Sequence, residues 1–455
     1  MSFLFFKESG IGMGHYFTKS AVLDEHEAVS AITQWAYPLV DRNGLDPLFS
    51  RIGDARIVML GEASHGTHEY YNWRSYITRR LIEEKGFQFI AVEGDWPDCY
   101  QLNRYIKNYQ QTGKGAYNVL HAFNRWPTWM WANWEIVALA DWLQQFNSRL
   151  ALNKKVGFYG LDLYSLWESM DNIIQYLKKT DPKALKVAVE AFRCFEPYQN
   201  EEGQSYAKAS LLVPELCENE VVHLLREVRN KLPTYNTDHE NVFNAEQNAL
   251  VMVNAEKYYR TMVHGGPHSW NLRDEHMSET MDRLLNFYGR NSKVVIWAHN
   301  THVGDARATD MIQEGMYNIG ELARLKYKQD VVLVGMGSFQ GSVFAGRNWG
   351  ATMQKMEVPA ARAGSWEYFL HKAGDQDKLL IMDDFHQDVF LENHIGHRAI
   401  GVVYNPEYER YGNYVPSILP LRYDAFVYID KTTALHPLHV QPDGHQIPET
   451  FPFGV

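Results

Sequence analysis

Short apolar runs rich in β-branched residues recur along the chain, and most are followed by a stretch with apolar residues three and four apart. The first run, residues 56–60, precedes the sequence GEASHGTHE and a helical pattern over residues 69–85, which Gly86 is placed to stop. The later runs are residues 87–92, 156–160, 293–298, 331–334, 379–382, 399–403 and 425–429. Strands of four to six residues alternating with helices are typical of a mainly parallel sheet with helices on both faces. We therefore predict an α/β fold, with edge strands and loops after residue 360.

Between residues 165 and 288 the alternation stops, and five segments in a row have helical spacing of their apolar residues. We predict a large helical insertion that caps the crevice of the sheet. The expected organisation is a first part of the α/β core at residues 1–164, the insertion at 165–288 and the second part of the core at 289–455. No repeat or long linker indicates an independently mobile domain.

Composition and charge disfavour several classes of protein. The 455 residues carry a formal net charge of −11, which disfavours nucleic acid and anionic membrane surfaces as partners. No apolar run approaches the length of a membrane-spanning helix, and the start of the chain does not resemble a secretory signal. Three widely spaced cysteines (Cys99, Cys194 and Cys217) without a CxxC motif fit a reducing compartment. We expect a cytoplasmic location.

Titratable side chains follow four of the predicted strands at the point where each strand ends. They are Glu62 and His65 after the first, Glu93 and Asp95 after the second, Asp162 after the third, and His299 and His302 after the fourth. In open α/β sheets the ligand crevice lies outside the carboxyl ends of the strands. One such residue is commonly a helix cap or loop residue, but four strand ends in register predict one functional rim.

The segment GEASHGTHE, residues 61–69, is the first candidate. Its two glycines allow close backbone approach, and Thr67 or Ser64 is placed to cap the next helix, whose amides offer an anion site. His65 is the candidate general base, with Glu62 or Glu93 fixing its tautomer. Arg74, two turns into the helix, is either a solvated arginine or a cation that pairs with Glu93 or a substrate oxygen.

The segment WAHNTHVGDA, residues 297–306, supplies the second group. His299 and His302 repeat the His-x-x-His spacing of His65 and His68. Imidazoles beside carboxylates suit zinc, manganese or iron, so a metal site is an alternative. No HExxH motif or cysteine-based zinc spacing supports it, and activation of water by a histidine needs no metal.

The segment WNLRDEHM, residues 270–277, opens the last helix of the insertion. Arg273 either reaches the crevice or forms a surface ion pair with Asp274 or Glu275. A tryptophan-rich stretch at residues 126–134 is predicted to be mostly core, with a pocket wall as the alternative. The glycine patterns match neither a nucleophile elbow, a dinucleotide fingerprint nor a P-loop.

Together these motifs resemble the erythromycin esterase family, within a broader group that includes ChaN-like haem-iron uptake proteins. The matching stretches are LGEASHGTHEYYNWR, FIAVEGDWPD, WNLRDEHM, VVIWAHNTHVGD and VGMGSFQGSV. The resemblance implies an α/β fold with a helical insertion. It also implies hydrolytic opening of a macrolactone ring, as in relatives that confer macrolide resistance, although members are also labelled succinoglycan biosynthesis proteins.

Carried onto this chain, the family's water-activating histidine falls on His65, and its other active-site positions fall on Glu62, Arg74, Glu93 and His299. We expect Arg273, His302, His68 and Asp95 to contact substrate.

The expected activity is therefore metal-independent hydrolysis of a carboxylic ester or macrolide-like small molecule, with no cofactor. A metal-dependent hydrolase using His65, His68, His299, His302 and nearby carboxylates is the first alternative. A non-enzymatic protein that binds haem or another macrocycle is the second.

Overall fold

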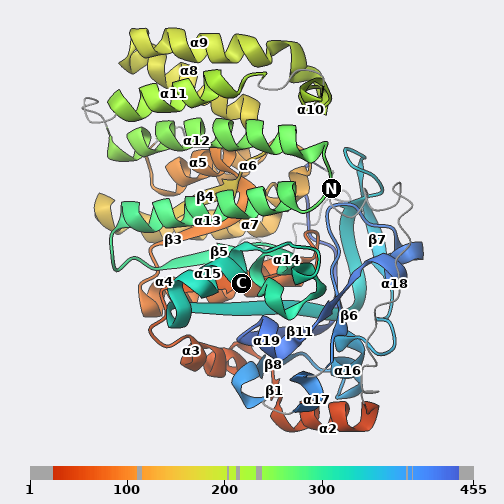
Figure 1. Ribbon diagram of the computed structural model, residues 1–455. Helices are drawn as coiled ribbons and strands as arrows, with labels where there is room; N and C mark the ends of the chain where they lie inside the picture. Colours follow the sequence, from red (N-terminus) through yellow and green to blue (C-terminus); the bar gives the residue numbers. More distant parts are fainter. Residues whose placement is uncertain are drawn as a thin grey trace. The chain divides into compact units, whose positions relative to one another are not determined.

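A nine-stranded mixed sheet forms the centre of the fold in the computed structural model (Figure 1), in the order β1-β8-β11-β6-β2-β5-β3-β4 with β7 paired to β6. The structure describes residues 24–109, 115–201, 204–211, 216–231, 238–385, 388–391 and 393–439. The strands are β1 (Tyr37–Pro38), β2 (Ile57–Leu60), β3 (Phe89–Asp95), β4 (Gly157–Asp162), β5 (Val294–Trp297), β6 (Val331–Gly346), β7 (Met353–Val358), β8 (Lys378–Ile381) and β11 (Ala425–Thr432). A separate antiparallel pair joins β9 (Ile395–Arg398) and β10 (Tyr414–Ser417). The predicted α/β class is confirmed.

The chain divides into two compact units. The first unit contains Arg104–Gly157 and the described residues up to Ile90 and from Tyr288 onward, whereas the second contains Ala91–Asn103 and Phe158–Phe287. The predicted domain boundaries at residues 164 and 288 stay a prediction, because compactness alone does not show that a segment is an insertion.

In the first unit β2 lies between β5 and β6 and is parallel to both, with Leu60 level with Trp297 and Val334. Every residue of β2 and β5 is buried, which is why these strands read as continuous apolar runs rather than as alternating patterns. Because the strands are parallel and in register, the loops after β2 and β5 leave the sheet at the same edge. This edge positions Glu62, His65 and His299.

Helices of the first unit follow or flank these strands. They are α2 (Glu25–Trp35), α3 (Asp46–Ile52), α4 (His68–Lys85), α6 (Ala116–Leu120), α7 (Trp134–Ser148), α14 (Asn300–Val303), α15 (Ile319–Tyr327), α16 (Trp366–Lys372), α17 (Asp388–Leu391), α18 (Glu409–Gly412) and α19 (Leu419–Arg422). Helix α4 ends at Gly86, which has a φ of 68°, so the predicted glycine stop is confirmed.

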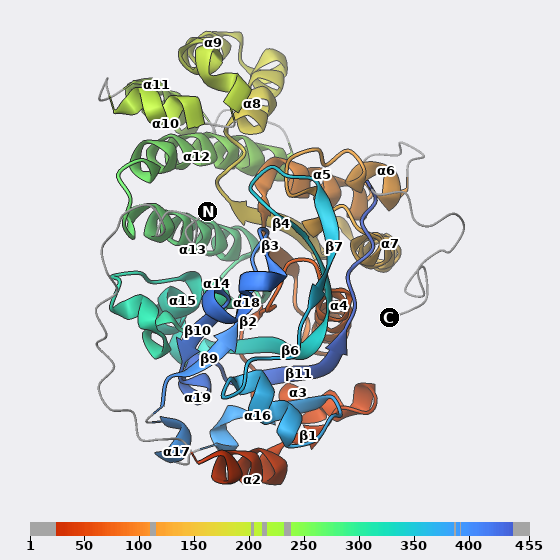
Figure 2. The same ribbon diagram turned by 90° about the vertical axis from the view of Figure 1, so that its right-hand side faces the viewer.

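The second unit is mainly helical. Its helices are α5 (Trp96–Ile106, which ends in the first unit), α8 (Leu166–Thr180), α9 (Pro182–Phe195), α10 (Gln204–Ser210), α11 (Glu218–Lys231), α12 (His239–Met262) and α13 (His268–Tyr288). Helix α9 packs against α8 and α11, and α12 also packs against α8 and α11 (Figures 1 and 2). Their shared apolar core includes Leu166, Phe195 and Val228.

A disulfide joins Cys194, in α9, to Cys217, just before α11, while Cys99 is a buried free thiol. The expectation of three reduced cysteines is therefore wrong. Spacing along the sequence carries no information about which cysteines meet after the helices pack. Disulfides persist in oxidising compartments, so this bond weighs against a reducing cytoplasm, and the cytoplasmic location stays a prediction. None of the helices in the described ranges has the length and apolarity needed to cross a membrane.

The carboxyl-terminal part of the chain differs from the prediction. Strand β6 runs for 16 residues rather than four and pairs with β7, which had no signal in the sequence. Residues 399–403 form no strand; Ile400 and Val403 make only isolated bridges. Strand β11 lies between β6 and β8 inside the sheet, whereas only edge strands were expected after residue 360.

Candidate active site

The loop between β2 and α4 brings Glu62 and His65 together. The Nδ1 atom of His65 lies 2.9 Å from Oε1 of Glu62, and both side chains are buried. The two glycines of this loop are required by close contacts: a Cβ at Gly61 would lie 2.1 Å from Oδ1 of Asn300, and a Cβ at Gly66 would lie 2.0 Å from a backbone oxygen. Of the two carboxylates predicted to orient His65, Glu62 occupies that position.

Arg74 fixes the other oxygen of the same carboxylate. Its Nη2 lies 2.5 Å from Oε2 of Glu62, and its guanidinium lies over the rings of Tyr71 and Trp297 at 4.4 and 4.7 Å. Arg74 is completely buried, so the alternative of a solvated surface arginine is wrong, and its carboxylate partner is Glu62 rather than Glu93. Contact of Arg74 with a substrate oxygen stays a prediction. The spacing of the sequence predicted that Arg74 lies near the carboxyl edge of the sheet. It did not predict that two aromatic rings enclose the guanidinium.

His299 follows β5 and lies beside His65, with ring centroids 4.9 Å apart. Nδ1 of His299 accepts a hydrogen bond from the backbone N–H of Thr301 at 3.3 Å and lies 2.8 Å from the hydroxyl of Thr301. Because a backbone N–H can only donate, Nδ1 of His299 carries no proton and the neutral ring is protonated at Nε2. Thr301 was not among the predicted site residues.

The two imidazoles therefore have opposite tautomers. The carboxylate of Glu62 favours a proton on Nδ1 of His65 and makes Nε2 its basic nitrogen, whereas His299 is a donor through Nε2. Two adjacent rings, one a base and one a donor, can remove a proton from a nucleophile and hydrogen-bond an oxygen atom of the same substrate. This pairing is the main chemical feature of the first unit.

The amino terminus of α4 differs from the predicted anion site. Thr67 is the N-cap residue, but its hydroxyl hydrogen-bonds Ser64 rather than a helix amide. The N–H of His68 donates to the carbonyl of Thr433 at 2.9 Å. This amide is therefore already engaged, and the structure does not support it as an oxyanion donor.

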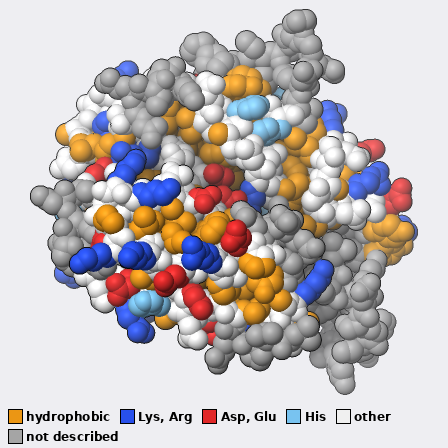
Figure 3. All heavy atoms as spheres, turned by 90° about the horizontal axis from the view of Figure 1, so that it is seen from above, with side chains coloured by type: hydrophobic (Ala, Val, Ile, Leu, Met, Phe, Trp, Pro, Cys, Tyr) orange, Lys and Arg blue, Asp and Glu red, His pale blue; other side chains and the backbone are white. Residues whose placement is uncertain are grey.

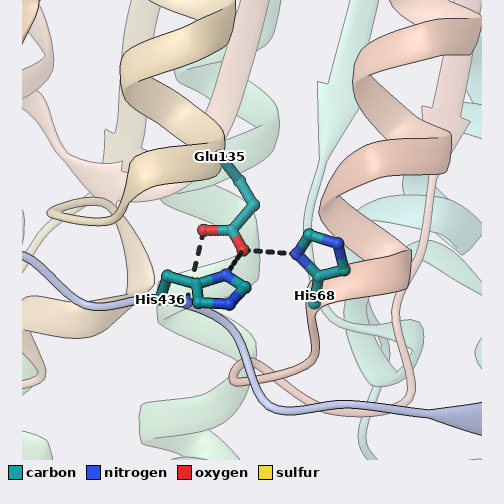
Figure 4. A group of neighbouring side chains, drawn as sticks. All are labelled: His68, Glu135 and His436. Carbon is teal, nitrogen blue, oxygen red and sulfur yellow. Dashed lines mark hydrogen bonds and ion pairs between the residues drawn. The ribbon is translucent and has the colours of Figure 1, made fainter. Parts of the chain in front are cut away.

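His68 belongs to a second group of side chains, shown in Figure 4. Its Nδ1 lies 2.5 Å from Oε1 of Glu135, the second residue of α7, and Nδ1 of His436 lies 2.7 Å from the same oxygen. Burial raises the pKa of Glu135, but the hydrogen bonds from His436 and His68 outweigh it and lower the pKa to about 2. The sequence gave no signal for Glu135 or His436, which lie 67 and 368 residues after His68.

An aromatic cluster of the first unit adjoins the His65 loop. The hydroxyl of Tyr71 lies 3.0 Å from the backbone oxygen of His65 and 2.9 Å from that of Met130. Trp129 and Trp131 are buried, as predicted for core residues, whereas the other two tryptophans of the stretch are half-buried. The ring of Trp131 lies 6.3 Å from that of Tyr71. Tyr71 thus ties the His65 backbone to the tryptophan-rich stretch.

Glu93, Asp162 and Arg273 meet in the second unit. Nη2 of Arg273 lies 2.7 Å from Glu93 and 2.6 Å from Asp162. Burial disfavours the charge of Arg273, but Asp162, Tyr164 and Glu93 outweigh it and raise its pKa. The alternative that Arg273 forms a surface ion pair with its helix neighbours is therefore wrong.

Two other predicted residues, Asp95 and His302, lie in a strand and in a short helix. Asp95 is the last residue of β3 and is half-buried, and His302 lies buried in α14. Substrate contact by these two residues, by His68 and by Arg273 stays a prediction.

On the face drawn in Figure 3, the basic and acidic side chains of the described residues are intermixed with hydrophobic ones. This distribution agrees with the acidic net charge of the chain.

Comparison with known proteins points to one family. The sequence model of the family described as "Erythromycin esterase" matches residues 82–432. Erythromycin esterase type II of Escherichia coli is 22% identical over 384 residues, which is 75% of this chain and 84% of that protein. The putative hydrolase YbfO of Bacillus subtilis (strain 168) is 21% identical over 398 residues, covering 83% of this chain and 84% of its own.

Solved structures share the fold. The crystal structure of a succinoglycan biosynthesis protein superposes with a TM-score of 0.73 at 22% identity, covering 90% of this chain and 98% of that one. A mutant of erythromycin esterase EreC in its open conformation gives a TM-score of 0.64 at 15% identity, covering 86% and 94%. The family model spans most of the sequence, and the chain belongs to the erythromycin esterase family.

Proposed function

We propose that this protein is a carboxylic ester hydrolase in which His65 activates water. The observation that carries the proposal is the pair of adjacent imidazoles with opposite tautomers, His65 held by Glu62 and His299 held by Thr301. Membership of the erythromycin esterase family supports a hydrolase, and the site supports the class of reaction.

In the proposed reaction, a water molecule attacks the ester carbonyl carbon while Nε2 of His65 takes one of its protons. The imidazolium that forms is stabilised by Glu62, whose own charge is balanced by Arg74. The carbonyl oxygen becomes an oxyanion and accepts a hydrogen bond from Nε2 of His299. The tetrahedral intermediate then collapses, the C–O bond to the alcohol breaks, and His65 returns its proton to the leaving oxygen.

The proposed substrate is an ester or macrolactone of a macrolide-like small molecule. The name of the Escherichia coli relative supports this class. The proposed reaction requires no cofactor.

The alternative of a metal centre built from His65, His68, His299 and His302 has less support. Among the described residues, the group that satisfies metal-ligand spacing joins His68 to Glu135 and His436, and it contains neither His65 nor His299.

The test is mass spectrometry of several macrolides and simple esters after incubation with the protein. We expect a product heavier by one water from at least one of them. We also expect His65→Ala to leave the fold intact and to lower turnover by at least about 100-fold, because general-base assistance contributes about 10²–10⁴-fold. His26→Ala, at an exposed position, is the matched control.

A folded His65→Ala variant with near-normal turnover would falsify the role of His65. Binding of a macrocycle without any product would instead favour the non-enzymatic alternative.

A further inference from the structure

His68, Glu135 and His436 come from three separate parts of the first unit and converge on one point (Figure 4). His68 begins α4, Glu135 lies in the first turn of α7, and His436 lies in the segment after β11. Each offers one ligand atom, and the three atoms lie within 4.8 Å of one another. Both imidazoles present the same nitrogen, Nδ1, to the carboxylate.

Backbone hydrogen bonds on both sides hold this arrangement in place. On one side, the N–H of His68 donates to Thr433 and the N–H of Leu435 donates to Gly66. On the other side, the N–H of Trp134 donates to the carbonyl of His436 at 3.0 Å, and the N–H of Leu438 donates to Ala132. The segment that carries His436 is therefore fixed between the starts of α4 and α7, and the three ligand atoms need no large movement to share an ion.

The donor set is two imidazoles and one carboxylate, which suits Zn²⁺ and other divalent first-row metals. The side chain of Glu135 is 1% exposed, whereas that of His436 is 41% exposed, so the group has a buried anionic side and a side open to water. Three protein ligands with an open side are typical of sites where a metal keeps a position for water or another ligand.

Asn72 contacts the second ring nitrogen of His68. Its amide lies 2.7 Å from Nε2 of His68, the ring nitrogen that faces away from Glu135. When a metal takes Nδ1, the ring proton moves to Nε2, and the Oδ1 atom of Asn72 can accept it after the amide turns over. A hydrogen-bonded second nitrogen is the usual support of a metal-binding histidine.

We propose that His68, Glu135 and His436 form a binding site for a divalent cation of the zinc type. The site is distinct from the His65–His299 pair and does not depend on the proposed ester hydrolysis. His68 follows His65 by three residues, so the two α-carbons are at most about 11 Å apart. Binding replaces two N–H···O hydrogen bonds by metal–nitrogen bonds and ties the segment after β11 to α4 and α7.

The experiment measures zinc bound to the full chain after metal stripping, addition of ZnCl₂ and desalting. We expect one zinc per chain in the unmodified protein and in His65→Ala. We expect His436→Ala and Glu135→Gln to weaken zinc binding by at least about 100-fold, beyond the 10–100-fold typical of loss of a supporting residue. His371→Ala is the matched control, because His371 pairs with the single carboxylate of Asp430, at 2.7 Å, within the described part of the chain.

Two further measurements keep the test independent of folding defects. Zinc is expected to raise the unfolding temperature of the unmodified protein and of His371→Ala but not that of folded His436→Ala, because a ligand that binds only the folded state stabilises it. Cobalt(II) is expected to give the visible absorption of a tetrahedral site, which the His436→Ala variant lacks. Absence of stoichiometric zinc, or equal zinc binding by folded His436→Ala, overturns the proposal, whatever the outcome for ester hydrolysis.

Discussion

Arg74, Glu62 and His65 form a line of charge-assisted hydrogen bonds at the scale of single residues. Arg74 lies 2.5 Å from one carboxylate oxygen of Glu62, and His65 lies 2.9 Å from the other. All three side chains are buried, so the ion pair is poorly screened and each member depends on the next. Glu62 therefore both orients the proposed base and neutralises a buried cation.

Replacing Glu62 by glutamine is expected to affect catalysis and stability together. A neutral amide cannot stabilise a charged His65, so we expect turnover to fall about 10²–10⁴-fold. Arg74 would also lose its counter-ion while completely buried, which is expected to cost about 3–5 kcal/mol of unfolding free energy. Steady-state kinetics and urea unfolding measure the two effects.

Glu84→Gln is the matched control, because Glu84 pairs with Arg80 on the exposed face of α4. That pair is expected to contribute less than about 1 kcal/mol. Normal turnover in a folded Glu62→Gln variant would show that Glu62 does not support His65.

At the scale of elements, α13 carries both the ion pair of Arg273 and a buried histidine. His276 is fully buried, with Nδ1 2.8 Å from the amide of Asn254 and Nε2 3.5 Å from the hydroxyl of Thr280. Burial lowers the pKa of His276 to about 4, below the ordinary 6.5, because the charged ring would lose its hydration.

This shift predicts a pH dependence of stability. Between pH 6.5 and 4 the unfolded chain binds a proton at His276 that the folded chain does not, so unfolding becomes easier as the pH falls. The loss attributable to His276 is about 2–3 kcal/mol between pH 7.5 and 4.5. We expect His276→Asn to show a correspondingly smaller loss in urea unfolding across that range.

The His264→Asn variant, at an exposed position, is the control and should follow the unmodified protein. An unchanged pH dependence in His276→Asn would mean that His276 is not kept neutral by the fold.

At the scale of the whole molecule, the sequence predicts those site residues that follow the ends of strands. Glu62, His65 and His299 follow apolar runs, and parallel strands in register bring their loops to one edge. The α/β class and the helical stretch follow from the same local periodicities.

The contacts that could not be predicted from the sequence depend on long-range packing. Glu135 and His436 meet His68 only because the segment after β11 crosses the starts of α4 and α7. The disulfide between Cys194 and Cys217 and the extension of β6 into a hairpin with β7 likewise depend on how distant segments pair. No local pattern reports those partners.

The central claim is that His65 and His299 are adjacent imidazoles that have opposite tautomers when both rings are neutral. The most direct measurement is nitrogen NMR of the protein labelled with ¹⁵N-histidine, with the signals assigned by His65→Gln and His299→Gln. The account predicts that above the pH at which both rings are neutral, His65 carries its proton on Nδ1 and His299 on Nε2. A proton on Nε2 of His65, or on Nδ1 of His299, would contradict it.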